Sequence, residues 1–373
     1  MTSPAPTIAA APLTAPATRY LALDALRGFT IAMMILVNTP GSWSFIYAPF
    51  AHADWHGVTP TDLVFPFFLF VVGSAMYFSL GKQTMSLTPA VALSITRRTL
   101  MIFALGLIFN GVLGGWENLR IMGVLQRIAL AYALAAVIVL MVARTGVYVI
   151  SALLLLGYWL LLVLGGGADP FGLTTNLVVK FDLAVLGADH LYQGKGVPFD
   201  PEGLLSTLPA VVNVLIGFEI TRILVAQPDR RRGLIKLLQL GAAGIALGLL
   251  WNFWLPINKS LWTSSFVIYT AGYFCFALAL FVWIVDIQKS QRLAQPFIIY
   301  GSNSIFIYML APFWVHAYVY IPFGGTNLYD GLFLLLAQVF PPKFASLLFA
   351  LLHVSLFWVV SWLLYRKKIF IRV

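Results

Sequence analysis

The sequence predicts an all-α membrane protein, a polytopic bundle of about ten spanning helices. Of its 373 residues, 61% are hydrophobic and only 10% are charged, whereas soluble domains carry roughly 45–50% apolar and ~25% charged residues. The apolar residues also gather into blocks close to the ~20 residues that one spanning helix needs. Three of these blocks contain no charged residue at all: Leu63–Leu80, Val147–Leu164 and Trp262–Val285.

The expected spanning segments follow these blocks in chain order. They lie at about residues 22–40, 61–81, 97–115, 121–142, 147–164, 203–226, 234–251, 262–285, 297–318 and 345–365. A further apolar stretch, Leu328–Phe340, is too short to span and predicts a re-entrant or interfacial helix. Residues 1–18 are rich in Ala, Pro, Thr and Ser and carry no charge. We therefore expect a disordered leader, followed by a single transmembrane domain at 19–373.

Local signals support several of these boundaries. The Thr-Pro-Gly sequence at 39–41 ends the first helix, because proline and glycine terminate helices. The Thr-Pro-Thr-Asp sequence at 59–62 begins the second, with Thr59 as the N-cap and an acid in the first turn. Asn303 and Ser304 interrupt the ninth helix, which marks either helix packing or a cavity wall. The basic run at 366–368 reads as a stop signal at the inner surface.

The basic residues predict the orientation. The loops on one face hold most of the Lys and Arg side chains, including the Arg230–Arg232 cluster, and positive charge favours the cytoplasm. With an even number of spans, both termini are then cytoplasmic. The outer face carries two long loops, 39–60 and 165–202, and long loops that keep their own chemistry are usually functional. Few basic residues fall on this face: Arg120, Lys180, Lys195, Lys259 and Lys343.

Several classes of function are excluded. The net charge of +10 does not indicate nucleic-acid binding, because the basic residues sit in short loops between apolar blocks and act as topology signals. The one cysteine, Cys275, cannot form an intramolecular disulfide or a Cys-based zinc site, and we expect no metal. No Walker A sequence, no GxGxxG after a strand and no GxSxG elbow occurs.

The first helix carries polar residues that are costly in a membrane. Ionisable groups cost about 2.5–3.5 kcal/mol each there, so Asp24 and Arg27 are expected to pair. Asn38 lies eleven residues beyond Arg27, which returns it to within about 20° of the same helix face, ~16 Å further along the axis. The two side chains are expected to line one groove at two depths, although Asn38 also fits a helix C-cap.

The first outer loop offers an acid–base candidate. His52 is of the residue type best suited to moving protons near neutral pH, and His56 is its rival. Asp62 either caps the second helix or orients and charges the imidazole. Asn258, Lys259 and Trp262 form a second polar group in another outer loop, beside the aromatic belt.

A set of longer matches points to one family. The chain contains, in order, LDALRGFTIAMMILVN (23–38), HADWHGVTPTDLVFPFF (52–68), MGVLQRIALAY (122–132), FDPEGLLSTLPAVVNVLIG (199–217), PINKSLWTSSFVIYTAG (256–272), GSNSIFIY (301–308) and YRKKIF (365–370). As a set, these stretches resemble the heparan-α-glucosaminide N-acetyltransferase family of transmembrane acyltransferases. The chain is especially similar to the bacterial members associated with N-acetylglucosamine utilisation.

The resemblance implies transfer of an acetyl group from cytoplasmic acetyl-CoA to an amino sugar on the far side of the membrane. It places the active histidine on His52, in its H-x-x-W-x-G setting, and the functional asparagine on Asn38. We add Asp62 as the residue that orients the imidazole. The expected CoA contacts are Arg27, Arg127, Asn303, Lys367 and Lys368. The expected sugar contacts are Trp55, Asp24, Asn258, Lys259 and Trp262.

Several alternatives stay open at this level. His52 is either a general base or the carrier of the acetyl group. His56-Gly57 stands where the animal enzyme has Asn-Gly, which leaves the acceptor sugar undetermined. The extra lumenal N-terminal domain of the animal members has no counterpart in this sequence, which favours a protein of the bacterial inner membrane. A transporter of N-acetylglucosamine or a related sugar and an O-acyltransferase acting on a glycan are the rival functions, and a homodimer is an assembly to test.

Overall fold

A computed structural model describes residues 20–80 and 86–371, so the expected leader at 1–18 lies outside the described residues. Within those ranges the regular structure is helical, apart from one antiparallel hairpin whose two strands have two residues each, β1 (Pro322–Phe323) and β2 (Thr326–Asn327). The long helices are α1 (Leu21–Asn38), α2 (Val64–Leu80), α3 (Pro89–Gly114), α4 (Val124–Met141), α5 (Arg144–Gly165), α7 (Thr207–Val225), α8 (Arg230–Trp251), α9 (Ser264–Val282) and α13 (Pro342–Arg366).

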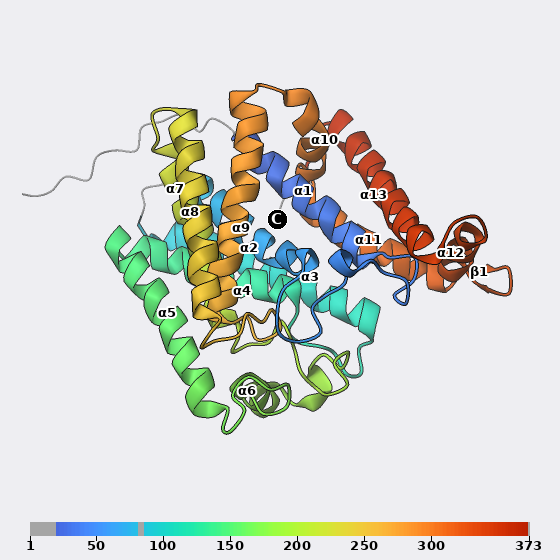
Figure 1. Cartoon of the computed structure of the whole chain (residues 1–373), viewed down its shortest axis with the longest axis horizontal. Coiled ribbons are helices and arrows are strands. Elements are labelled where there is room, and N and C mark those ends of the chain that lie inside the picture. Colours follow the sequence, from blue (N-terminus) through green and yellow to red (C-terminus); the bar gives the residue numbers. More distant parts are fainter. Residues whose placement is uncertain (1–19, 81–85, 372–373) are drawn as a thin grey trace, which may run out of the picture.

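The shorter elements complete the bundle and its loops. They are η1 (Ala48–Phe50), η2 (Pro60–Leu63), α6 (Leu177–Leu186), η3 (Ala188–His190), η4 (Trp283–Ile287), α10 (Gln291–Gly301), α11 (Ser304–Val319) and α12 (Leu328–Val339). Figure 1 shows α8 and α9 running side by side, α13 along the opposite side of the molecule, and α6 below the bundle among the loops.

The expected number of spans is confirmed for the described residues. Among them, nine helices are long and apolar enough to cross a membrane, and the pair α10 and α11 makes a tenth if it counts as one span. The two helices of this pair meet at a 69° bend, at the point where Asn303 and Ser304 interrupt the sequence pattern. The chain is therefore a multi-pass integral membrane protein.

Several expected boundaries differ from the structure. The third helix begins at Pro89 instead of 97, because Thr88 accepts a hydrogen bond from the Val91 backbone N–H and caps it. The long loop at 165–202 contains a helix of its own, α6. The helix expected from 262 begins at Ser264, because Trp262 has a left-handed backbone with φ of 52°.

Successive long helices run in opposite directions, which gives the bundle two ends. We call the end that holds Arg230–Arg232, the start of α1 and the end of α13 the basic end. The opposite end holds the connections 39–59, 166–206 and 252–263 together with α6 and α12, and we call it the loop end. All the candidate residues of the first outer loop lie at the loop end.

The core is formed by α1, α2, α4, α7 and α9, which are more than half buried, whereas α3, α5, α8 and α13 are mostly exposed and form the outer surface. Glycines bring α2 and α7 into direct backbone contact. A Cβ atom on Gly73 would lie 1.9 Å from the Val214 carbonyl oxygen, and one on Gly217 would lie 2.0 Å from the Phe70 carbonyl oxygen. This close packing fixes the helix that follows Asp62 in the chain.

Candidate active site

The loop end is organised around one buried carboxylate. Asp62 sits in the short helix η2, where the Thr59 backbone N–H donates to its Oδ2 at 3.0 Å and the Thr59 hydroxyl donates at 3.1 Å. The Ala53 backbone N–H donates to the same oxygen at 3.1 Å. Asp62 therefore caps the helix, as its sequence position predicted, and it also ties the first outer loop to the start of α2.

The other oxygen of this carboxylate binds His52. Asp62 Oδ1 lies 2.6 Å from His52 Nδ1, and the imidazole is 44% exposed while the carboxylate is 2% exposed. An ionised carboxylate can only accept, so Nδ1 carries the proton and donates it to Asp62. In the neutral ring, the lone pair is then on Nε2. The structure thus gives Asp62 both roles, as a cap and as the partner of His52.

Lys259 reaches the same pair from the loop between α8 and α9. Its Nζ lies 3.4 Å from Asp62 Oδ1 and 3.2 Å from His52 Nδ1. The Lys259 side chain is only 19% exposed, and burial lowers the pKa of its ammonium group, against the opposing attraction of the Asp62 and Glu202 carboxylates. Lys259, which was expected to bind the sugar, therefore contacts both His52 and Asp62 directly.

Two neighbours of Lys259 have a different position from the one expected. Asn258 and Trp262, both expected at the sugar, are fully buried. The Asn258 side-chain oxygen accepts from the Leu261 backbone N–H at 2.8 Å, and the Trp262 indole donates to Asn213 at 2.8 Å. Because neither side chain is accessible, they shape the loop that presents Lys259 instead of forming an exposed binding surface.

Trp55 joins the two long loops. Its indole N–H donates to the Phe171 carbonyl at 2.8 Å, and its ring packs edge-on against Phe199 at 5.4 Å between centroids. His56, the rival of His52, faces Asn258 with its Nδ1 3.3 Å from the amide nitrogen. Burial lowers the pKa of His56, partly offset by the negative charge of Asp169. Among the described residues, no carboxylate makes a hydrogen bond to His56 like the one that orients His52.

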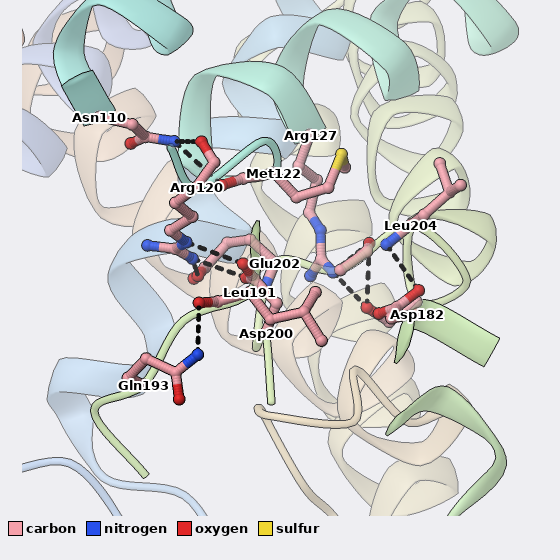
Figure 2. Close-up of polar contacts among 12 residues, drawn as sticks. Asn110, Arg120, Met122, Arg127, Asp182, Leu191, Gln193, Asp200, Glu202 and Leu204 are labelled. Atoms are coloured by element: carbon pink, nitrogen blue, oxygen red, sulfur yellow. Dashed lines mark hydrogen bonds and ion pairs between the residues drawn. The ribbon is translucent and has the colours of Figure 1, made fainter. Parts of the chain in front are cut away.

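A second group of polar residues connects the loop at 165–202 to the helices. Figure 2 shows Arg120 and Arg127 reaching toward the turn that precedes α7. Arg120 holds both oxygens of Asp200 at 2.8 and 2.6 Å and Glu202 at 2.7 Å. Asp182, from α6, accepts from the Leu204 and Leu205 backbone N–H groups at 3.1 and 3.2 Å. These ion pairs and hydrogen bonds attach the second outer loop to the bundle.

Arg127 does not lie where a CoA contact is expected. It is fully buried near the start of α4, at the loop end, where it donates to the Gly203 carbonyl at 3.1 Å and to the Ser206 hydroxyl. Its guanidinium carbon lies 4.9 Å from the centre of the Trp262 ring. Arg127 lines neither of the two cavities described below, so the structure gives it a packing position.

A cavity of about 640 Å³ opens at the basic end, within the size range of ~300–1,000 Å³ typical of ligand pockets. Arg27 and Arg98 line it, and Arg27 pairs with Asp24 at 3.3 Å as expected. Asp24, expected as a sugar contact, therefore lines this cavity at the basic end and lies away from His52. The Arg98 guanidinium lies over the Tyr132 ring at 4.8 Å, and its buried Nε has no hydrogen-bond partner among the described residues. A buried N–H without a partner is a position where an anionic ligand can bind.

The C-terminal tail closes one side of this inner cavity. The Asn303 amide donates to the Ile369 carbonyl at 3.0 Å, and its oxygen accepts from the Ile371 backbone N–H at 2.8 Å. Phe370 and Ile371 then line the cavity. Asn303 is itself fully buried, so it positions the tail and does not face the cavity. Lys367 and Lys368, two further expected CoA contacts, are exposed at the end of α13 and do not line the cavity.

Asn38 lies in a separate outer pocket of about 370 Å³. It shares this pocket with Thr39, Trp43, His316 and Tyr329. Arg27 and Asn38 thus line two cavities at opposite ends of α1 instead of one continuous groove. No hydrogen bond joins Asn38 to His52 among the described residues.

The inner cavity extends toward the His52–Asp62 pair along α2. Phe68 lines the cavity and lies six residues after Asp62, which corresponds to roughly 9 Å along a helix axis. Tyr308 of α11 lines the same end and packs edge-on against Phe68 at 6.2 Å between ring centroids. The two regions are therefore neighbours within one bundle.

Comparison with known proteins identifies the family of the chain. The sequence model described as heparan-alpha-glucosaminide N-acetyltransferase, catalytic, matches residues 19–249. The chain belongs to this family. Two relatives carry the name heparan-alpha-glucosaminide N-acetyltransferase. The protein from Homo sapiens is 29% identical over 350 residues, 78% of this chain and 52% of the relative. The protein from Mus musculus is 28% identical over 354 residues, 79% of this chain and 53% of the relative. The chain spans about half the length of these curated relatives.

Several residues that line the cavity or hold the loops were not predicted from the sequence. Arg98 lies near the start of the helix expected at 97–115, where basic residues commonly act as topology signals, although its position within α3 brings it to the inner cavity. The Arg120, Asp200 and Glu202 cluster was missed because its members are about 80 residues apart in the chain. The available signal was the pair of acids Asp200 and Glu202 in a loop between apolar blocks. Acids that become buried need a basic partner, so this pair could have predicted the contact with Arg120.

We predict that Asp182 makes stability depend on pH. Burial raises the pKa of Asp182 to about 6, above the unfolded value of about 3.9. Between these values the folded protein binds the extra proton, so stability falls as the pH rises through this window, by on the order of 3 kcal/mol. In Asp182→Asn the pH dependence between pH ~4 and ~6 should weaken, as measured by thermal unfolding in detergent. A stability difference between the two proteins that is the same at both ends of this window would contradict the assignment.

Proposed function

We propose that the chain is a transmembrane acetyltransferase that moves an acetyl group from acetyl-CoA to the amino group of a glucosamine-type sugar. The observation that carries this proposal is the His52–Asp62 contact of 2.6 Å at one end of a bundle whose other end holds a cavity lined by Arg27 and Arg98. Membership of an acetyltransferase family supports the same reaction. The donor binds at the basic end, and the acceptor binds at the loop end.

The inner cavity has the chemistry that a CoA donor requires. Its basic residues, Arg27 and Arg98, suit the phosphate groups, and the unpaired Nε of Arg98 offers a buried donor. Apolar residues such as Val71 and Phe68 continue the cavity along α2, which suits the extended pantetheine arm. In this scheme the thioester reaches the loop end through the centre of the bundle, next to His52.

His52 supplies the proton chemistry. An amine attacks a thioester only as the free base, so a group must remove its proton. The Nε2 lone pair of His52 takes this proton, while Asp62 holds Nδ1–H and stabilises the charge that develops on the ring. The bond between the amine nitrogen and the acetyl carbon forms, the carbon–sulfur bond breaks, and the CoA thiolate leaves and takes up a proton.

A two-step route uses the same nitrogen. His52 Nε2 attacks the thioester first, the CoA thiolate leaves, and the acetyl group then passes from the imidazole to the sugar amine. In either route negative charge develops on the acetyl oxygen, and the Asn38 amide is the donor that we propose for it. Loss of such a donor typically slows a reaction by ~10²–10³-fold.

The proposed location is the inner membrane of a bacterium, with the basic end in the cytoplasm. The Arg230–Arg232 cluster and the end of α13 then face the cytoplasm, in agreement with the preference of positive charge for that side. This orientation brings the inner cavity to the compartment that supplies acetyl-CoA and exposes His52 on the outer side.

The first test is acetyl transfer by the purified protein, with acetyl-CoA and glucosamine as substrates and free thiol as the readout. His52→Ala should lose at least ~10²-fold in turnover, because the base or acetyl carrier is gone. His56→Ala, only four residues away, should retain most of the activity, since His56 has no carboxylate partner comparable to Asp62.

Full turnover by the His52→Ala protein would remove His52 from the mechanism. Release of thiol with a hydroxyl acceptor but not with an amine would favour an O-acyltransferase. Uptake of N-acetylglucosamine into proteoliposomes without acetyl-CoA would favour a transporter instead.

The donor cavity has a separate test. Arg98→Met removes the unpaired N–H group and one positive charge from the cavity, so the KM for acetyl-CoA should rise about tenfold with a smaller change in the KM for the sugar. Arg97→Met is the matched control, because Arg97 is exposed and does not line the cavity. An equal rise of both KM values in Arg98→Met would argue against a donor site there.

A further inference from the structure

Lys259 contacts both members of the catalytic pair, although it comes from a loop about 200 residues away. The loop leaves this side chain little freedom. The Lys259 carbonyl accepts from the Trp262 backbone N–H at 3.0 Å, and the Thr263 hydroxyl donates to the Pro256 carbonyl at 2.9 Å. The Gly57 backbone N–H also donates to Ile257 at 2.7 Å, which joins this loop to the loop of His52. The ammonium group is thus held in place by a rigid backbone.

The hydrogen atoms around His52 Nδ1 can be assigned from the contacts. The 2.6 Å contact with Asp62 requires Nδ1–H to donate to the carboxylate. An ammonium group has no acceptor, so Lys259 cannot receive that hydrogen, and it cannot donate to a nitrogen that already carries one. Lys259 therefore donates to Asp62 Oδ1 at 3.4 Å, and its charge lies beside the imidazole at 3.2 Å without a hydrogen bond to it.

The two charges act on the imidazole in opposite directions. A carboxylate at hydrogen-bond distance favours the protonated, cationic ring, and a protonated ring has no lone pair on Nε2. A cation at a similar distance disfavours the protonated ring. A pair made of His52 and Asp62 alone would therefore tend to hold a proton on the base that the reaction needs free.

We propose that Lys259 is a positioning residue whose ammonium charge offsets the Asp62 carboxylate and keeps His52 in its neutral form, with the Nε2 lone pair available near neutral pH. This inference rests on the proposed function, in which His52 acts through Nε2. It gives Lys259 a role in setting the pH range of the reaction, in place of the direct sugar contact that its loop position suggested.

The other charged groups near the pair act less directly. Glu202 attracts the Lys259 ammonium and Lys195 repels it, and Lys195 also lies 3.4 Å from the Asp54 carbonyl. His56 lies against Asn258, with its Nδ1 3.3 Å from the amide nitrogen. Among these described groups, only Asp62 and Lys259 contact the His52 ring, so these two set the balance of charge on it.

The test compares the pH profile of kcat/KM in three variants. In Lys259→Met the acid limb should move up by about one pH unit, with a loss that approaches tenfold on the acid side of the profile and is recovered at higher pH. Lys259→Arg should restore the original profile, because the charge remains. Lys180→Met is the control, because it also removes a cation at the loop end. The Lys180 ammonium is exposed and donates to the Gly165 carbonyl, and it does not contact His52 or Asp62 among the described residues. A Lys259→Met profile that is merely lower at every pH, with an unmoved acid limb, would overturn the proposal.

A second readout needs no activity. The chain has five histidines, so titration of ¹⁵N-histidine-labelled protein by NMR, with His52→Ala to identify the His52 signal, reports protonation of the ring directly. The midpoint for His52 should rise in Lys259→Met and not in Lys259→Arg. If it rises while no acetyl transfer is found, the charge balance holds and the proposed function fails. If it does not rise, the inference about Lys259 is wrong whatever the activity.

Discussion

The architecture of the loop end depends on the burial of the Asp62 carboxylate. A buried charge is unfavourable unless it is paired and hydrogen-bonded, and here the donors come from separate parts of the chain. The Ala53 and Thr59 backbones bind one oxygen, and His52 and Lys259 surround the other. One side chain therefore fixes the first outer loop, the start of α2 and the loop before α9 against one another.

This constraint gives the bundle two chemically different ends. The loop end presents an oriented imidazole, whereas the basic end has a cavity with arginines and apolar walls. The close packing of α2 on α7 through Gly73 and Gly217 keeps α2, which connects the two ends, in a fixed position. Phe68, which lines the cavity, lies about two helical turns from Asp62, so in the proposed reaction a thioester on an extended arm crosses this distance to the histidine. Transfer across a bilayer requires this proximity.

The sequence predicted those features that local patterns encode. Hydrophobic blocks gave the spans, and the Thr-Pro-Thr-Asp sequence at 59–62 gave the cap from which Asp62 binds His52, ten residues away. The burial of individual polar residues could not be predicted from the sequence. Arg127 and Trp262 look available but are fully buried, because contacts with α7 and its preceding turn cover them. Asn258 is fully buried by contacts within its own loop and with His56. The contact of Lys259 with His52 likewise depends on tertiary packing that no local pattern reports.

The central claim is that His52 and the Arg230–Arg232 cluster lie on opposite sides of the bilayer. The one cysteine, Cys275, is buried, so a Cys275→Ala background allows single-cysteine labelling. Asp54→Cys and Arg231→Cys both replace exposed residues, and a membrane-impermeant maleimide can be applied to sealed vesicles of either orientation. The account predicts that each vesicle orientation labels only one of the two positions, and that the position changes with the orientation. Labelling of both from the same side would contradict it.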